Sequence, residues 1–241
     1  MSKLGFSLLL ALAAFTVAAQ NPAREEEQDT VEVTQRVKKP DSLKEKIHFR
    51  SLRFGTDILA LILSGSDRYN GWELNADADF GRFYLAVDNG FASRDEIIVT
   101  GGNYHVDGNY WRLGADVNLL KKDPDRNMLF FGLRYARSSA TEQIIYNGTD
   151  PYFGNVQYQI TNSAVVGSWG EMVAGLRIKV WKEFWMGFTS RLKFGLAVRG
   201  AKELSPYYTP GYGVIGDGIT WGFNYQVFWR IPFDRQKKPS K

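Results

Sequence analysis

The sequence predicts an all-β fold, an eight-stranded antiparallel up-and-down transmembrane β-barrel with short periplasmic turns and long extracellular loops. The first observation is that apolar and polar residues alternate in one segment after another, with the period of a β-strand. The second is that aromatic residues occupy one face and full charges the other, which is typical of a barrel with an apolar exterior and a polar interior. The third is that the strand-like segments number eight, and an even count places both ends of the chain on the same side.

The N-terminus has the features of a secretory signal. Lys3 precedes an apolar segment at 5–17, and the small residues at 17–19 form a cleavage site, so we expect a signal peptide over 1–19. The apolar segment is shorter than the roughly 20 residues that a spanning helix needs, and no later stretch approaches that length. Since only helices and closed barrels span a bilayer, a membrane protein with this sequence must be a barrel.

Composition and charge exclude some classes of protein and indicate how the rest of the chain is divided into segments. The chain has no Cys, which excludes disulfides and a lipid-anchored N-terminus, and its net charge of +4 is too small to suggest binding to nucleic acid. Residues 20–46 are polar and charged with little to bury, which predicts a disordered periplasmic segment. The barrel is expected over 47–234, followed by a short basic periplasmic tail at 235–241.

The clearest alternation lies between Trp72 and Phe91. Even positions are apolar up to Phe80, and the odd positions between them carry acids or Asn. After Gly81 the parity changes, so that odd positions become apolar. This change predicts two strands joined by a tight turn at 79–82.

The other six strands follow from the same pattern. They are expected at 49–63, 109–119, 128–139, 169–181, 184–198 and 218–233. The connections then alternate in length, with long loops at 64–70, 95–108, 140–162 and 200–217 and short turns at 79–82, 121–127 and 182–183. Long external loops and short periplasmic turns are typical of outer-membrane barrels, and this order indicates a periplasmic N-terminus.

The apolar face is predicted to point outward, towards lipid. Eight strands enclose a space that is barely wide enough for side chains, and the aromatic residues of the last two strands would not fit there. Aromatic residues near strand ends suit the girdles at the membrane–water interfaces. The expected interfacial residues are Trp72, Trp111, Trp181, Trp221, Tyr225 and Trp229.

The polar face then fills the interior with charge. The expected interior acids are Asp57, Glu73, Asp77, Asp79, Asp88, Asp116 and Glu171, and the bases are Arg53, Arg82, Arg112, Arg134, Arg177, Lys179, Arg191, Lys193 and Arg230. Acids concentrate on strands two to four and bases on strands five to eight, so closure brings the two sets face to face. Because an unpaired buried charge is costly, these groups are expected to pair and to plug the lumen. A selective ion path would need a wider bore.

No catalytic, cofactor-binding or metal-binding residue stands out, and the sequence predicts no enzyme and no cofactor. His48 is expected at the periplasmic rim and His105 in solvent, and neither has a catalytic partner at strand spacing. Residues 211–216 (GYGVIG) match a dinucleotide-binding pattern, but that pattern has meaning only between a strand and a helix. The alternative hypotheses are a lipid-modifying outer-membrane enzyme and a small-ligand-binding barrel or narrow pore.

The C-terminal half resembles a family of small outer-membrane β-barrels of Bacteroidota that is uncharacterised in function. The motifs that carry the resemblance are FFGLRYARS at 130–138, GEMVAGLRIKVW at 170–181, FWMGFTSRLKF at 184–194, PYYTPGYG at 206–213 and FNYQVFWRIPF at 223–233. The resemblance implies a barrel in the outer membrane of a Gram-negative bacterium and carries over no functional residue. We expect a structural, adhesive or complex-subunit role, with outer-membrane lipid and other envelope proteins as partners. The loops at 140–162 and 200–217 are the expected contact surface.

Overall fold

The computed structural model describes residues 48–97, 102–120, 126–200, 204–216 and 218–233. The signal peptide, the segment at 20–46 and the tail at 235–241 lie outside the described residues, and these assignments remain predictions.

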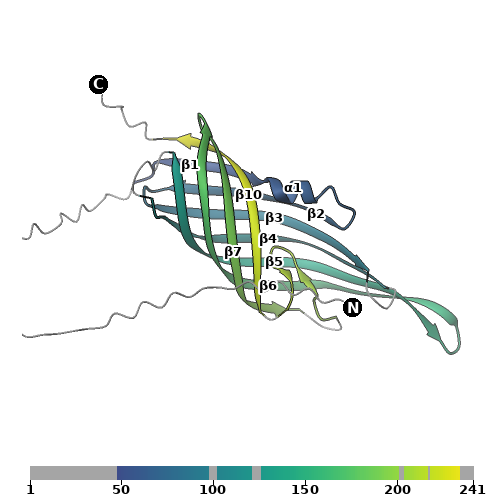
Figure 1. The fold of residues 1–241 in the computed structure, drawn as a ribbon. Helices are drawn as coiled ribbons and strands as arrows, with labels where there is room; N and C mark the ends of the chain where they lie inside the picture. The colour runs from purple at the N-terminus through teal and green to yellow at the C-terminus, as the bar shows by residue number, and fades with distance from the viewer. Residues whose placement is uncertain (1–47, 98–101, 121–125, 201–203, 217, 234–241) are drawn as a thin grey trace, which may run out of the picture. The chain divides into compact units, whose positions relative to one another are not determined.

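The described residues form a closed β-barrel (Figure 1). Its strands are β1 (Ser51–Asp57), β2 (Tyr69–Asp79), β3 (Phe83–Ile97), β4 (Asn103–Asn118), β5 (Asn127–Asp150), β6 (Gly154–Trp181), β7 (Phe184–Arg199) and β10 (Ile219–Pro232). They pair in the order β1-β10-β7-β6-β5-β4-β3-β2, and every pair is antiparallel. The predicted fold class is confirmed.

The alternation in the sequence becomes an alternation between the two faces of the wall. In β3, residues 83–90 switch between exposed and buried at every step. The turn before β3 uses Gly81, which has a φ of 91°, a value that a residue with a Cβ rarely adopts. Asp79 stabilises this turn by accepting a hydrogen bond from the Gly81 N–H at 2.7 Å. The parity change at Gly81 therefore marks the predicted hairpin.

The first predicted strand is wrong in its second half. The strand expected over 49–63 ends at Asp57, and residues Ile58–Leu63 form the short helix α1. Asp57 caps this helix, since its carboxylate accepts a hydrogen bond from the Leu59 N–H at 3.0 Å. A short apolar run such as ILALIL fits either structure, so periodicity alone could not separate helix from strand.

Two of the predicted long loops are mostly strand. The loop expected at 95–108 is largely taken up by β3 and β4, and the loop expected at 140–162 forms the outer parts of β5 and β6, joined by a turn at 151–153. In Figure 1 these two strands run past their neighbours as a two-stranded ribbon. Tyr146 pairs with Tyr158 across the ribbon and their rings stack at 5.3 Å, a cross-strand contact that supports the extension.

The exterior of the barrel is apolar. Among its exposed side chains are Phe54, Leu74, Phe83, Leu85, Leu113, Phe131, Leu133, Leu176, Phe188 and Phe223. The six expected interfacial aromatics are also exposed. Trp181 ends β6 and Trp221 lies near the start of β10, whereas Tyr225 lies in the middle of β10 rather than near its end. No helix among the described residues is long and apolar enough to cross a membrane.

Candidate functional site: the charged interior and its mouth

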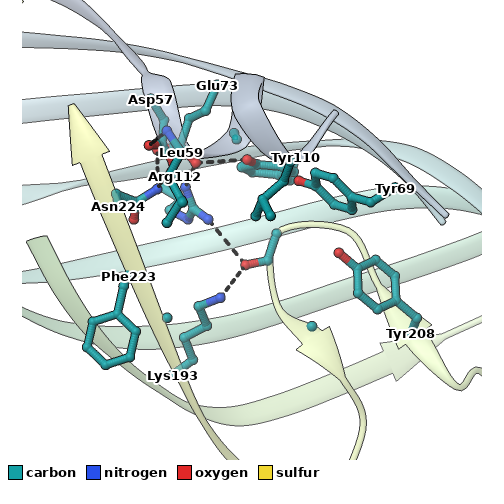
Figure 2. Close-up of a pocket in the computed structure, with 15 residues that line it drawn as sticks. Asp57, Leu59, Tyr69, Glu73, Tyr110, Arg112, Lys193, Tyr208, Phe223 and Asn224 are labelled. Carbon is teal, nitrogen blue, oxygen red and sulfur yellow. Dashed lines mark hydrogen bonds and ion pairs between the residues drawn. The ribbon is translucent and has the colours of Figure 1, made fainter. Parts of the chain in front are cut away.

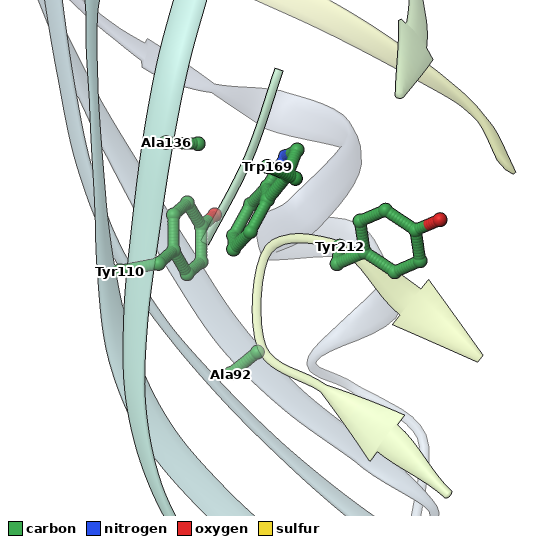
Figure 3. Packing of buried hydrophobic residues seen from close by; sticks show 5 residues of the cluster. All are labelled: Ala92, Tyr110, Ala136, Trp169 and Tyr212. Atoms are coloured by element: carbon green, nitrogen blue, oxygen red, sulfur yellow. The ribbon is translucent and has the colours of Figure 1, made fainter. Parts of the chain in front are cut away.

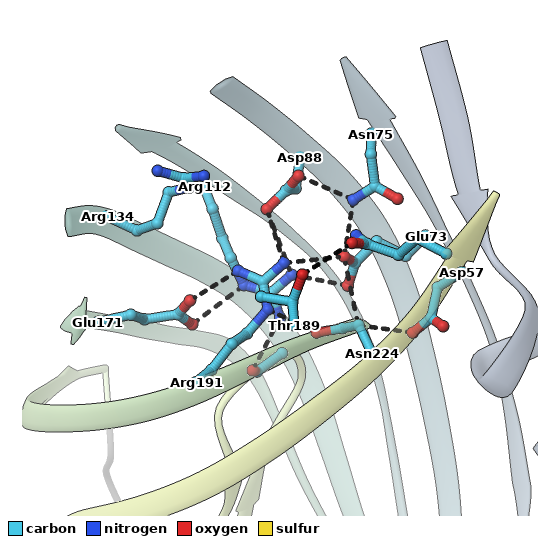
Figure 4. Close-up of polar contacts among 12 residues, drawn as sticks. Asp57, Glu73, Asn75, Asp88, Arg112, Arg134, Glu171, Thr189, Arg191 and Asn224 are labelled. Carbon is cyan, nitrogen blue, oxygen red and sulfur yellow. Dashed lines mark hydrogen bonds and ion pairs between the residues drawn. The ribbon is translucent and has the colours of Figure 1, made fainter. Parts of the chain in front are cut away.

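A network of five charged side chains crosses the middle of the barrel (Figure 4). Arg112 on β4 forms ion pairs with Glu73 at 2.6 Å and Glu171 at 3.0 Å. Arg191 on β7 contacts Glu171 at 3.0 Å and Asp88 at 3.1 Å, and it lies 3.5 Å from Glu73. All five side chains are buried. Two arginines therefore share three carboxylates that come from β2, β3 and β6.

A second group lies closer to the end of the barrel where β1 begins and β2 ends. Asp77 on β2 accepts a hydrogen bond from Arg53 at 2.7 Å and also pairs with Arg177 of β6, on the other side of the barrel. The guanidinium of Arg53 lies 4.7 Å from the ring centre of Tyr84, and that of Arg177 lies 4.5 Å from the ring centre of Phe228. Aromatic faces attract guanidinium groups, so these rings stabilise the two cations where carboxylates are few.

A third group is an ion pair between neighbouring strands β4 and β5. Arg134 binds Asp116 with two nitrogens, at 2.7 Å each. A Cβ on Gly132 would collide with the Asp116 carboxylate, so this glycine provides the space that the carboxylate occupies. The contact between Nη2 and Oδ2 is a hydrogen bond between two charged groups, which is stronger than one between neutral groups.

The structure buries thirteen of the sixteen residues expected in the interior. Arg82 is a correction, because it is exposed at the turn after Asp79 rather than inside. Lys179 and Arg230 are partly buried near the same end of the barrel, where Lys179 pairs with Glu183 at 3.6 Å and Arg230 with Asp79 at 3.8 Å. Acids and bases meet across the barrel, as Arg191 and Glu73 do, but they also pair between adjacent strands, as Arg53 and Asp77 do.

The segment between β7 and β10 folds inward rather than outward. Two short strands, β8 (Tyr208–Thr209) and β9 (Gly213–Val214), form a small hairpin. Lys193 donates hydrogen bonds to the carbonyl oxygens of Gly211 at 2.8 Å and Tyr212 at 2.9 Å, and Arg112 donates to Gly211 O at 3.2 Å. We call residues 204–216 the inner hairpin. Its inward course corrects the expectation that 200–217 is an external contact loop.

Tyr212 anchors the inner hairpin in an apolar cluster (Figure 3). Its ring is 1% exposed and packs edge-on against Trp169, with ring centres 5.6 Å apart. Ala92, Tyr110 and Ala136 complete the cluster. The Tyr- and Pro-rich composition of this loop indicated a contact surface, and the surface that it contacts is the barrel's own interior.

A cavity of about 140 Å³ remains beside the inner hairpin (Figure 2). Helix α1 lines it with Leu59, Ala60 and Leu63, and the barrel wall adds polar side chains that include Asp57 and Lys193. Asp57 accepts hydrogen bonds from Asn224 and from the backbone N–H groups of residues 59 and 225. Among the described residues, neither Asp57 nor Lys193 forms an ion pair. The sequence predicted both residues to lie inside but could not show that they lack partners of opposite charge.

His105 lies on β4 and is partly exposed. Its Nδ1 atom lies 2.7 Å from Asp95 Oδ1, and its Nε2 atom lies 3.5 Å from Asp107 Oδ1. In the part of the chain that the structure describes, neither ring nitrogen of His105 hydrogen-bonds a serine. His105 and its two aspartates therefore do not form the catalytic triad of a serine hydrolase there.

The ring of eight strands, the apolar exterior and the charged interior define the class: a small β-barrel whose polarity is reversed relative to a soluble barrel. A family model described as "Domain of unknown function (DUF6048)" matches residues 1–236, and the chain belongs to this family.

Solved structures of small barrels are similar to this chain at low identity. Neisserial surface protein A (NspA) is 11% identical, with 77% of this chain and 96% of that chain covered and a TM-score of 0.35. The N-terminal β-barrel domain of Pseudomonas aeruginosa OprF is 10% identical, with 76% of this chain and 100% of that chain covered and a TM-score of 0.33. Ail, the attachment invasion locus protein of Yersinia pestis, solved with the heparin analogue sucrose octasulfate, is 10% identical, with 76% and 97% covered and a TM-score of 0.37. Among curated proteins, no sequence matches this chain.

Proposed function

We propose that this protein is a non-enzymatic barrel of the Gram-negative outer membrane, closed to ions, which contacts other envelope proteins through its extracellular end. The apolar exterior supports the membrane location, because exposed side chains such as Phe131 and Leu133 would be unfavourable in water and favourable in lipid. We further propose that both termini lie in the periplasm, and the resemblance to barrels of Bacteroidota supports an origin in that group.

The interior supports a closed lumen. Eight strands leave room for little more than side chains. The network of Arg112, Arg191, Glu73, Asp88 and Glu171 occupies the middle of the barrel, and the inner hairpin lies towards one end. We therefore propose that the interior charges serve stability rather than conduction.

The single observation that carries the contact role is the ribbon formed by the outer parts of β5 and β6. It extends beyond the ends of β4 and β7, and its tip exposes Tyr152 and Phe153 at 92% and 82%. Exposed aromatic side chains are the residues that most often anchor protein–protein contacts. An adhesive or complex-subunit role fits this ribbon better than a purely structural one.

The test compares partner recovery between the wild type and a Tyr152→Ser/Phe153→Ser variant. Intact cells are crosslinked, the outer membrane is extracted, and proteins joined to the barrel are identified. We expect the variant to fold and to shift on unheated gels like the wild type but to lose the crosslinked partners. Tyr207→Ser is the matched control, because Tyr207 is 44% exposed and lies outside the ribbon. Equal recovery from all three proteins would contradict the contact role, and recovery of the wild type in the soluble periplasmic fraction would contradict the membrane location.

A further inference from the structure

The barrel wall is incomplete on one side. Strand β1 pairs with β2 only as far as Thr56 and with β10 only as far as Asp57. Beyond these points β2 continues to Tyr69 and β10 to Ile219, so 69–73 of β2 and 219–225 of β10 flank an interval without a strand. Helix α1 contacts both β2 and β10 beside this interval. We call this interval the lateral gap.

Side chains at the two ends of α1 replace part of the missing strand. Asp57 accepts a hydrogen bond from the Tyr225 N–H at 3.1 Å, on the β10 side. Ser64 hydrogen-bonds both the N–H and the carbonyl of Gly71, on the β2 side. On the β2 side, Thr56 also donates a hydrogen bond to the Glu73 carbonyl at 2.8 Å, and the Tyr69 N–H donates to the Ser66 carbonyl at 3.4 Å. The inner side of the gap is therefore polar, and a polar headgroup suits it better than an acyl chain, because polar groups are costly to bury in hydrocarbon.

The 140 Å³ cavity described above borders the lateral gap. The cavity is lined by Leu59, Ala60 and Leu63 of α1, and by Gly222, Phe223 and Asn224 of β10. Its volume is several times the roughly 30 Å³ that one water molecule occupies in the liquid. The outward side of α1 is apolar, with Ile62 69% exposed. The outer side of the lateral gap is therefore apolar, and the cavity on its inner side is lined in part by polar side chains.

Two ionisable side chains that line the cavity, Asp57 and Lys193, form no ion pair among the described residues. Glu73 and Arg112 also line it, but they neutralise each other at 2.6 Å. Asp57 and Lys193 are 3% and 8% exposed, bind only uncharged groups, and lie at different ends of the group drawn in Figure 2. Lys193 uses two of its three N–H donors on backbone carbonyls, so one donor is left. A ligand with one positive and one negative group satisfies both residues.

We propose that the lateral gap admits a membrane phospholipid with a zwitterionic ammonium–phosphate headgroup, of the phosphatidylethanolamine type. Its ammonium group binds Asp57, its phosphate binds Lys193, and its acyl chains lie along the apolar outward side of α1 in the bilayer. This inference rests on the proposed membrane location, and it adds a lipid-binding site to a barrel that otherwise contacts proteins.

The test is native mass spectrometry of the full chain, folded in detergent and titrated with phosphatidylethanolamine or phosphatidylglycerol. We expect one saturable phosphatidylethanolamine per barrel, bound about tenfold more tightly than phosphatidylglycerol, because a hydrogen bond between charged groups contributes roughly a factor of ten or more. Asp57→Asn keeps a helix-capping oxygen and is expected to remove the preference between the lipids. Lys193→Met is expected to weaken binding of both lipids about tenfold.

Two further variants separate lipid binding from folding. Lys179→Met removes a lysine outside the cavity and is expected to bind like the wild type. Gly222→Val keeps all charges but fills the cavity, since a Cβ at this position would lie 2.9 Å from Lys193 Cε, and it is expected to lose phosphatidylethanolamine. Each variant is first shown to fold by its shift on unheated gels.

Several outcomes would overturn the proposal. The first is that both lipids bind equally well and in many copies per barrel. The second is that the folded variants Asp57→Asn and Lys193→Met bind phosphatidylethanolamine with unchanged affinity. The third is that free phosphoethanolamine binds as tightly as the lipid, which would show that the acyl chains do not contribute to binding. Each of these results leaves the proposed membrane location and ribbon contacts standing. Failure of the wild type to enter membranes would instead show up in the fractionation experiment.

Discussion

At the scale of single residues, Arg191 is a buried cation that contacts three carboxylates. It lies within 3.5 Å of Glu73, Asp88 and Glu171, and its Nε donates to Asn224. Removing it leaves three carboxylates in a poorly hydrated space with Arg112 as their remaining partner. We expect Arg191→Ala to lower the free energy of unfolding by about 3–5 kcal/mol, measured by urea titration in lipid vesicles. A change below about 1 kcal/mol would show that the interior is hydrated enough to stabilise these carboxylates without the arginine.

Arg134 allows a cleaner test, because it has one charged partner. Arg134→Ala removes the ion-pair partner of the buried Asp116, so we expect a clear loss of thermal stability. The double variant Arg134→Ala/Asp116→Asn removes the stranded charge as well and is expected to recover part of the loss in the same melting experiment. If the double variant is no more stable than Arg134→Ala, the ion pair does not account for the effect.

At the scale of elements, the inner hairpin depends on Tyr212. Tyr212→Ala removes a fully buried ring from the cluster with Trp169 and is expected to cost about 3–5 kcal/mol of the hairpin's attachment, as large-to-small changes in packed cores do. Limited proteolysis of the folded barrel is expected to cut 204–216 faster in this variant. Tyr207→Ala is the control, since that side chain is partly exposed. Equal cleavage of both variants would show that hydrogen bonds from Lys193 and Arg112 suffice to hold the hairpin.

At the scale of the whole molecule, the direction of the two faces decides membrane insertion. Phe131→Arg places a charge on the exterior of β5 and is expected to reduce insertion into vesicles, at a cost of about 2–4 kcal/mol near the bilayer midplane. Tyr152→Arg at the ribbon tip introduces the same charge and is expected to insert normally. Normal insertion of both, with a defect in Gly132→Leu alone, would show that the faces are reversed.

The closed interior also belongs to this scale. In planar bilayers the wild type is expected to show no steady conductance, because under the proposed function the charge network and the inner hairpin close the lumen to ions. A stable, ion-selective open channel in the wild type would contradict the closed lumen and make pore function the leading hypothesis.

The alternation of residues was enough to predict the fold class and the burial of residues such as Arg112 and Glu171, because a strand sends successive side chains to opposite faces whatever it pairs with. The identity of each ion pair could not be predicted. Arg191 meets Glu73 only because the barrel closes with a particular register, and that register depends on all eight strands rather than on any local segment. The lateral gap beside α1 and the inward course of the inner hairpin also depend on tertiary contacts rather than on local sequence. ILALIL is compatible with strand or helix, and a Tyr-rich loop is compatible with either side of the wall, so the contacts with β2, β10 and Trp169 decide both.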